Sequence, residues 1–166
     1  MIKVRTLQEQ DWPVVWQLME PVIRAGETYP YAQDMTVNQA RQMWLEATES
    51  AYVAQDENEV IVGTYYIKPN QPGLGAHVAN CGYLVAEQAR GRGVATRMGE
   101  HSQQEAIRLG YRAMQFNLVV ETNEASVHLW KKLGFDIVGK LPGAFNHAKH
   151  GFVGAFVMYK ILVGEG

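Results

Sequence analysis

A short glycine-rich segment at residues 88–96, QARGRGVAT, has the residue types needed to bind a phosphate group. A helix is expected to begin near Gly93, and the N–H groups in the first turn of a helix lack internal partners and lie at the positive end of its dipole. Gly91 and Gly93 let the chain bend and let an anion approach the backbone closely. Arg90 and Arg92 add positive charge. The segment therefore predicts a phosphate site, although an isolated Gly-x-Gly pair is more often an ordinary loop.

Two common phosphate-binding motifs do not fit this segment. A P-loop requires a Lys-Ser/Thr pair after its last glycine, and none follows Gly93. A dinucleotide fingerprint requires a third Gly or Ala where this chain has Thr96. The segment must belong to another class of anion site.

A second motif narrows that class. Residues 88–93 match the pattern Q/R-x-x-G-x-G/A, and residues 123–135, NEASVHLWKKLGF, match N-x-x-S/A-x-x-L-Y-x-x-x-G-F except for one aromatic position. With both motifs at this separation, the chain resembles the GCN5-related N-acetyltransferase (GNAT) family over nearly its whole length. The resemblance implies that acetyl-CoA is the cosubstrate and that an amine receives the acetyl group.

The resemblance also implies which residues contact acetyl-CoA. The backbone of Tyr83, Leu84 and Val85 is implied to contact the pantetheine arm. Asn123 and the helix containing Ser126 are implied to lie beside the pantetheine and the thioester. The implied pyrophosphate site comprises Gln88, Arg90, Gly91, Arg92, Gly93, Val94, Ala95 and Thr96.

Acetyl transfer to an amine requires a neutral nucleophile, because an alkyl amine with a pKa of ~10 is mostly protonated near neutral pH. Many relatives begin the proton path with a carboxylate in the strand before the glycine turn. The corresponding residues 77–85, HVANCGYLV, contain no Asp or Glu. His77 and Asn80 are the polar candidates, and Asn80 is preferred because its amide can orient the amine or a water and can steady an oxyanion.

Two further residues shape the predicted catalytic centre. Trp130 stands where the family pattern usually has a tyrosine that protonates the departing thiolate, and an indole cannot do so. Trp130 is therefore expected to pack along the coenzyme or the substrate. Asn117, on a neighbouring strand, supplies another amide, so the catalytic candidates are Asn80 and Asn117. If these two converge with Asn123, neutral amides line the site and orient a small polar substrate.

The acceptor is expected to be a small molecule. Three features of the chain are similar to the branch of the family that contains the fungal acetyltransferase of proline analogues. They are the amide-rich pattern, the segment GETYPY near the start and the segment LPGAFNHAKHG near the end. That branch acts on small imino or amino acids such as azetidine-2-carboxylate. Substrate contacts are then expected from Glu27, Thr28, Tyr29 and Tyr31 and from the late loop at Asn146 and His147. An aromatic loop is equally often a plug of the core, and the histidines near residue 147 are equally typical of a solvated loop.

Two alternative functions stay open. The same fold can acetylate a protein N-terminus or a lysine, which requires an open groove. A coenzyme-A-binding sensor that lost catalysis would also explain the absent carboxylate and Trp130. A thiol-release assay with amines, amino acids and peptides separates these functions.

The elements that must position these residues follow from periodicity and turn signals. Pro21 predicts a kink or break near Glu20 in the first long helix, because proline removes a backbone donor. A long loop is expected between the last two strands. Strands are expected at 2–6, 51–55, 60–68, 76–85, 113–120, 135–141 and 152–162, with helices from a cap at Thr6 or Asp11 to about Arg24 and at 36–48, 93–109 and 123–133.

This order predicts one α/β domain over residues 1–166, with a mixed, mostly antiparallel sheet of about seven strands flanked by about four helices. It is also the order of elements in the GNAT fold. The chain contains no internal repeat or linker, so a single core is expected.

Composition excludes several classes of partner. Apolar residues make up 47% of the chain, charged residues 19%, and the net charge is -2, without the basic excess of a nucleic-acid-binding protein. Cys81 is the single cysteine, no zinc-ligand spacing occurs and no stretch approaches a membrane span, so we expect a cytoplasmic protein without metal, membrane or nucleic-acid partners. A homodimer is expected because dimers are frequent among the proteins this chain resembles.

Overall fold

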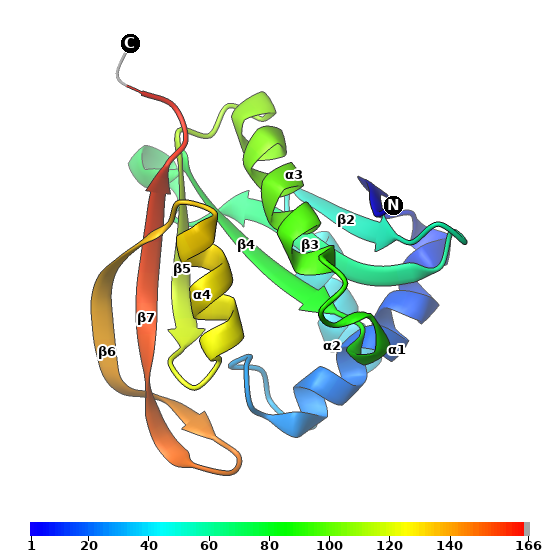
Figure 1. Cartoon of the computed structure of the whole chain (residues 1–166), viewed down its shortest axis with the longest axis horizontal. Coiled ribbons are helices and arrows are strands. Elements are labelled where there is room, and N and C mark those ends of the chain that lie inside the picture. The colour runs from blue at the N-terminus through cyan, green and yellow to red at the C-terminus, as the bar shows by residue number, and fades with distance from the viewer. Residues whose placement is uncertain (165–166) are drawn as a thin grey trace.

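The computed structural model describes residues 1–164, which form a seven-stranded sheet covered by helices on both faces (Figure 1). The predicted fold class is confirmed. The strands are β1 (Lys3–Thr6), β2 (Ser50–Gln55), β3 (Ile61–Pro69), β4 (Val78–Val85), β5 (Ala113–Val120), β6 (Asp136–His147) and β7 (Gly151–Ile161). The longer helices are α1 (Trp12–Ala25), α2 (Val37–Arg41), α3 (Val94–Arg108) and α4 (Glu124–Lys132).

The sheet has one parallel junction, and it lies in the middle. The strand order is β1-β2-β3-β4-β5-β7-β6, and every neighbouring pair is antiparallel except β4 and β5. These two strands pair only through Val78 with Ala113 and Ala79 with Met114, after which they diverge (Figure 1). The sheet therefore opens into a V-shaped gap whose edges carry unpaired backbone groups.

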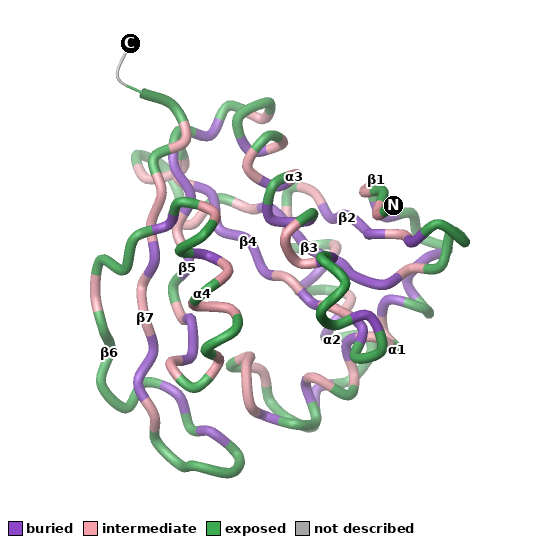
Figure 2. Tube along the Cα trace, in the orientation of Figure 1, coloured by how far each residue is buried: buried purple, intermediate pink, exposed green. Residues whose placement is uncertain are grey.

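The two faces of the sheet bury different cores. Alternation along β3 places Tyr65 with Met98 of α3 in one cluster and Tyr66 with Trp44, beyond α2, in the other. The buried trace in Figure 2 follows β2 to β5 and β7, whereas most of β6 at the sheet edge is exposed. Helices α3 and α4 thus cover one face, and α1 and α2 cover the other (Figure 1).

Helix α1 runs without interruption through Pro21, so the predicted break near Glu20 is wrong. Val15, Met19 and Ile23 form its buried stripe at helical spacing. Pro21 lies on the exposed side, and the carbonyl that loses its donor belongs to Gln17, which is also exposed. Water can satisfy that carbonyl, which lowers the cost of proline in the helix interior.

The segment expected to be a long loop near the C-terminus is instead a β-hairpin. β6 continues to His147, with Asn146 opposite Phe152 and His147 opposite Gly151. The pairing register with β7 shifts between Leu141 and Phe145, and the turn-forming residues that suggested a loop lie within this irregular stretch of β6. The hairpin closes tightly because His147 Nδ1 accepts hydrogen bonds from the N–H groups of Lys149 and His150, at 3.1 and 3.2 Å.

The remaining elements differ from expectation only at their ends. Thr36 and Gln39 form the predicted capping box of α2. That helix becomes a π-helical turn at Gln42–Glu46 rather than continuing to Thr48. β4 begins at Val78, so His77 lies just outside it, exposed to solvent.

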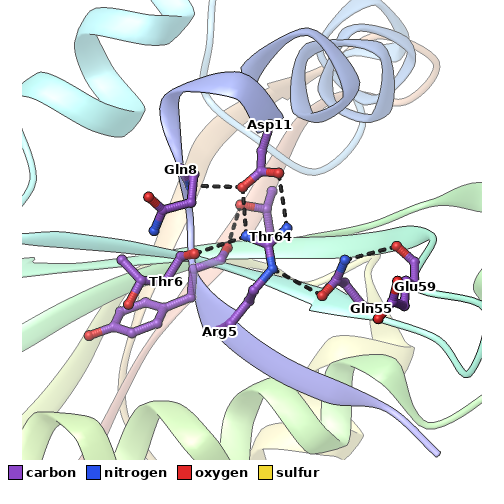
Figure 3. A network of polar contacts seen from close by, with 8 residues as sticks. Arg5, Thr6, Gln8, Asp11, Gln55, Glu59 and Thr64 are labelled. Atoms are coloured by element: carbon purple, nitrogen blue, oxygen red, sulfur yellow. Dashed lines mark hydrogen bonds and ion pairs between the residues drawn. The ribbon is translucent and has the colours of Figure 1, made fainter.

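A polar network fastens β1 to the start of α1 (Figure 3). Nη1 and Nη2 of Arg5 donate to the Asp11 carboxylate, at 2.7 and 3.0 Å, and the N–H of Gln8 donates to the same carboxylate at 2.7 Å. Arg5 also donates to the side chain of Gln55 in β2 at 3.0 Å. These bonds hold the pKa of Asp11 below its usual range, chiefly through Arg5.

Candidate active site

A cleft of about 1020 Å³ occupies the gap between β4 and β5. The loop after α1, the starts of α3 and α4 and the β6–β7 turn also line it. Most of the predicted site residues meet there. They are Glu27, Thr28, Tyr29, Tyr31, Asn80, Tyr83, Leu84, Val85, Arg90, Gly91, Gly93, Val94, Ala95, Thr96, Asn117, Asn123, Ser126 and Trp130. Gln88, Arg92 and Asn146 do not line it.

The glycine turn forms an anion cradle at the start of α3. Gly91 and Gly93 have φ values of 75° and 78°, which an L side chain rarely adopts. A Cβ at either position would meet no atom within 4 Å, so each glycine faces open space. The N–H groups of Val94, Ala95 and Thr96 have no hydrogen-bond partner among residues 1–164. This geometry fits a diphosphate, because those amides and the helix dipole point into the cleft opening.

The three arginines around the cradle point in different directions. Arg92 extends toward the β2–β3 turn, where its guanidinium lies 3.9 Å from Asp56 and 4.0 Å from Glu57. Arg97 lies 3.9 Å from Glu100 on its own helix. Arg90 is the arginine that lines the cleft. The spacing of residues in the motif does not reveal this difference, because it depends on tertiary neighbours.

The edge of β4 that faces the gap is engaged by the loop after α1. The Tyr29 hydroxyl donates to the carbonyl of Tyr83 and accepts from the N–H of the same residue, both at 2.6 Å. Burial raises the pKa of Tyr29 above its usual range, so the hydroxyl stays protonated. The resemblance assigns these Tyr83 backbone groups to pantetheine. A ligand can use them only after the Tyr29 hydroxyl moves.

Asn80 is buried, and its amide bridges the two sides of the gap. Its Nδ2 donates to the backbone carbonyl of Gln115 on β5 at 3.0 Å, and its Oδ1 accepts from the Tyr66 hydroxyl at 3.3 Å. The side chain therefore ties β4 to β5 just beyond their last paired residues. One amide hydrogen of Asn80 is left for a ligand, because the Nδ2 group has two.

Of the other two predicted amides, Asn117 belongs to a short chain of hydrogen-bonded side chains and Asn123 caps a helix. The Gln115 side chain donates to Asn117 Oδ1 at 2.9 Å, and Asn117 Nδ2 donates to Asn70 Oδ1 at 2.7 Å. Asn117 is exposed at the mouth of the cleft. Asn123 caps α4, with its Oδ1 accepting from the N–H of Ser126 at 3.4 Å. The three asparagines do line one cleft, and each also supports the local backbone.

Trp130 belongs to the core as well as to the cleft wall. Its ring centroid lies 4.6 Å from those of Tyr83 and Phe116 and 5.9 Å from that of Phe135. A Cβ at Gly99 of α3 would come within 3.0 Å of the indole, so this glycine admits the large ring between α3 and α4. Trp130 thereby sets the depth of the cleft, a packing role that the sequence pattern only partly indicates.

Of the two late residues from which substrate contacts were expected, His147 lines the cleft and Asn146 does not, because side chains alternate between faces along a strand. Some cleft residues escaped the sequence-based prediction. Tyr66, Lys68 and Cys81 also line the cleft. Strand alternation from Asn80 through its paired neighbours would have indicated Lys68 and Tyr66.

Three titratable groups in the cleft are unsuited to accept a proton from the acceptor amine. Burial raises the pKa of Tyr31 and of Cys81 to about 12 in each case. The Lys149 ammonium, 2.5 Å from the Glu27 carboxylate, holds the pKa of that carboxyl below its usual range. His147 Nδ1 accepts two backbone hydrogen bonds, so its proton resides on Nε2. His77, the weaker catalytic candidate, lies outside the cleft.

The fold and the cleft define an α/β protein with a cradle of unpartnered amides beside a split in its sheet. Comparison with known proteins agrees. The model of the acetyltransferase (GNAT) family matches residues 4–135. N-acetyltransferase aca1 of Schizosaccharomyces pombe is 31% identical over 151 residues, which span 81% of this chain and 72% of that protein. The chain therefore belongs to the acetyltransferase (GNAT) family, which makes it an acyltransferase.

Solved structures share the fold. A GCN5-related N-acetyltransferase from Kribbella flavida has a TM-score of 0.92 and 41% identity, covering 96% of this chain and 97% of that one. The phosphinothricin acetyltransferase (Pat) from Sinorhizobium meliloti, in complex with acetyl-CoA, has a TM-score of 0.85 at 18% identity, covering 99% and 90%. The predicted family and enzyme class are confirmed, and the branch acting on proline analogues stays a prediction.

Two kinds of feature are absent from residues 1–164. No helix within that range combines the length and apolar character needed to span a membrane. The same residues contain no cluster of three or more His, Cys, Asp or Glu side chains arranged to hold a metal ion.

Proposed function

We propose that the protein binds acetyl-CoA in the cleft between β4 and β5 and transfers the acetyl group to the amine of a small molecule. The observation that carries this proposal is the cradle of unpartnered N–H groups at the start of α3, with two left-handed glycines facing open space. Its position beside the split in the sheet lets a long ligand pass from the cradle into the gap. The Sinorhizobium meliloti relative, which shares this fold, was solved with acetyl-CoA.

In this proposal each part of the cleft has one task. The amides of residues 91–96 and the Arg90 guanidinium hold the pyrophosphate. The freed edge of β4 at Tyr83, Leu84 and Val85 holds the pantetheine arm. Asn80, next to the last paired residues, orients the acceptor amine by accepting its N–H at Oδ1, and steadies the developing oxyanion with its remaining N–H.

The acceptor amine has to lose a proton, and β4 carries no carboxylate that could accept it. The tyrosines remain protonated and the ionised Glu27 is stabilised as a carboxylate by Lys149, so it holds a proton weakly. The amine therefore delivers its proton to water in the open cleft, and turnover rises with pH as the neutral amine becomes more abundant.

A small acceptor is favoured by two contacts that close one end of the cleft. The Lys149 ammonium in the β6–β7 turn pairs with Glu27 in the loop after α1, at 2.5 Å. The N–H of Ala148 in the same turn donates to the carbonyl of Gly26 at 3.0 Å. Together they join the two segments across the acceptor end, where an extended peptide would need an open path. Within this class, azetidine-2-carboxylate and related imino acids are the specific candidates.

The proposal is tested by calorimetric titration with acetyl-CoA, followed by a thiol-release assay with amino acids, imino acids, simple amines and peptides. We expect binding of acetyl-CoA and release of thiol with small acceptors. Turnover of peptides alone would assign the protein to the N-terminal or lysine acetyltransferases. Binding without any turnover would favour a coenzyme-A sensor, which the absence of a carboxylate in β4 permits.

We also propose that the protein is a cytoplasmic homodimer. Its single cysteine, Cys81, is buried and unpaired, as suits a reducing compartment. The outer strand β6 exposes Val138 and Leu141, and the neighbouring Phe152 is 78% exposed, so the sheet edge offers an apolar surface to a second copy. Sedimentation equilibrium of the wild type and of Val138→Glu tests this assembly, and a monomeric wild type would exclude it.

A further inference from the structure

Lys68 is a cleft residue for which the proposed chemistry above has no task. It lies in β3 directly opposite Asn80 of β4, on the same face of the sheet. Its ammonium lies 5.4 Å from the centre of the Tyr66 ring, whose hydroxyl bonds to Asn80. The side chain is half-buried and lines the acceptor end of the cleft.

The charges at this end do not balance without a ligand. Lys149 is neutralised by Glu27, which is the carboxylate that lines the cleft within residues 1–164. Lys68 forms no ion pair with any carboxylate in the same part of the chain. His147 and His150 add no negative charge. A partly desolvated ammonium without a counter-ion is unfavourable and attracts an anionic group.

We propose that Lys68 binds a carboxylate of the acceptor, so that the substrate is an α-amino or α-imino acid rather than a simple amine. This inference rests on the proposed function, because it concerns the second substrate of that reaction. Directly opposed residues on antiparallel strands have Cβ atoms ~5 Å apart. A molecule whose amine and carboxylate are separated by one carbon spans Asn80 and Lys68 at once. The lysine thus selects the substrate and orients its amine.

The positive charge also predicts which amines are rejected. An acceptor with a second ammonium group near the reacting amine would meet Lys68 with like charge and bind poorly. A carboxamide has the shape of the acid and lacks its charge. Comparing an acid with its own amide therefore isolates the contribution of the ion pair.

The test compares kcat/KM for matched acceptors, such as proline, prolinamide and pyrrolidine, with the wild type, Lys68→Met and Lys68→Arg. For the wild type we expect the acid to exceed the amide roughly tenfold to hundredfold, the range expected of a charge-assisted hydrogen bond. Lys68→Met should remove this preference by raising KM for the acid, and Lys68→Arg should retain much of it. The affinity for acetyl-CoA should be unchanged in both variants. Lys3→Met, an exposed lysine outside the cleft, is the matched control.

The outcomes separate this inference from the proposed function. Efficient turnover of the amide or of pyrrolidine by the wild type, with no preference for the acid, would overturn the role of Lys68 and leave the acetyltransferase assignment intact. If no acceptor is turned over, calorimetric binding of the same three compounds to the protein loaded with coenzyme A gives the answer. Selective binding of the acid, lost in Lys68→Met, supports the carboxylate site. Equal binding of all three, or none, contradicts it.

Discussion

Asn80 has two tasks, and two measurements on a single variant can distinguish them. Its amide joins β4 to β5 through the Gln115 carbonyl, and its remaining N–H faces the proposed acceptor site. For Asn80→Ala we expect turnover to fall roughly a hundredfold, as when one oxyanion donor is removed, with a smaller loss of acetyl-CoA affinity. Thiol-release kinetics and calorimetry measure the two quantities. Asn70→Ala removes the amide that accepts a hydrogen bond from Asn117. Asn70 lies outside the cleft, so this variant should retain nearly full turnover. A loss confined to coenzyme affinity would exclude a catalytic role for Asn80.

Gly91 permits a second test with a well-matched control. Gly91 and Gly73 both have positive φ values, 75° and 60°, and a Cβ at either position would meet no atom within 4 Å. Gly73 lies outside the cleft, so Gly73→Val introduces similar backbone strain without obstructing the cradle. We expect Gly91→Val to weaken acetyl-CoA binding about tenfold or more in calorimetry, because the branched side chain blocks anion approach to the amides. Equal affinities of the two variants would place the diphosphate elsewhere.

At the residue scale, the sequence predicts backbone chemistry better than side-chain contacts. The tasks of Gly91 and Gly93 depend on their backbone conformation, and glycine is the residue type that adopts positive φ values most readily. Both residues do lie in the left-handed region. Arg92 was expected at the phosphate and instead points toward Asp56. Its direction depends on a turn more than thirty positions earlier in the chain, and no local pattern carries that information.

At the element scale, helices and meander strands follow local periodicity, and long-range pairing decides the rest. The expected helix at residues 93–109 and strand at 113–120 agree with α3 and β5. Residues 142–147 contain Pro and Gly and were expected to form a loop. They belong to β6 instead, because residues 145–147 pair with β7, and the register shift between Leu141 and Phe145 accommodates the Pro and Gly. Because of this error the prediction did not distinguish Asn146 from His147, whereas alternation along the strand exposes Asn146 and turns His147 inward.

The contact between the loop after α1 and β4 predicts a variant with two linked effects. Tyr29→Phe removes the hydroxyl that satisfies both backbone groups of Tyr83 and leaves them without partners in the ligand-free protein. We expect the free energy of unfolding to fall by about 1–3 kcal/mol, the cost of unsatisfied buried polar groups. Because pantetheine is proposed to bond the same groups, the ligand-free state alone is penalised, and acetyl-CoA should bind more tightly.

Urea unfolding and calorimetry measure these two effects independently. Tyr31→Phe is the matched control, since Tyr31 stacks on Tyr29 at 5.2 Å between ring centroids and makes no contact with the Tyr83 backbone among the hydrogen bonds of residues 1–164. Weaker acetyl-CoA binding by Tyr29→Phe would mean that the hydroxyl stays on β4 in the complex, and pantetheine would then have to use other groups.

At the scale of the whole molecule, the split between β4 and β5 creates the site, and no local property of either strand predicts it. Both strands have ordinary apolar patterns, yet they share only two paired positions. Bulky side chains pack near the gap on both faces of the sheet, Trp130 in one core cluster and Tyr66 in the other. The family resemblance supplied the order of the elements in advance, and the divergence of β4 and β5 becomes visible only in the folded sheet.

The two layers of helices must be held to the same sheet for the gap to keep its shape, and the Arg5–Asp11 pair performs that task at the N-terminus (Figure 3). Arg5→Met leaves the buried Asp11 carboxylate with one backbone donor, so we expect the free energy of unfolding to fall by about 2 kcal/mol at neutral pH. The folded-state pKa of Asp11 is lowered by Arg5, so this stability is present above the unfolded pKa of ~3.9 and is lost as pH falls through the folded value.

The difference between the wild type and Arg5→Met should therefore shrink as urea unfolding is repeated from neutral pH to below about pH 3. Arg41→Met is the matched control, because Arg41 pairs with Glu9 and Glu46, both of which are exposed. Its effect should stay within about 0.5 kcal/mol at every pH, as for other surface ion pairs. A destabilisation by Arg5→Met that persists unchanged in acid would show that Arg5 acts through packing of its side chain on β2 rather than through the Asp11 carboxylate.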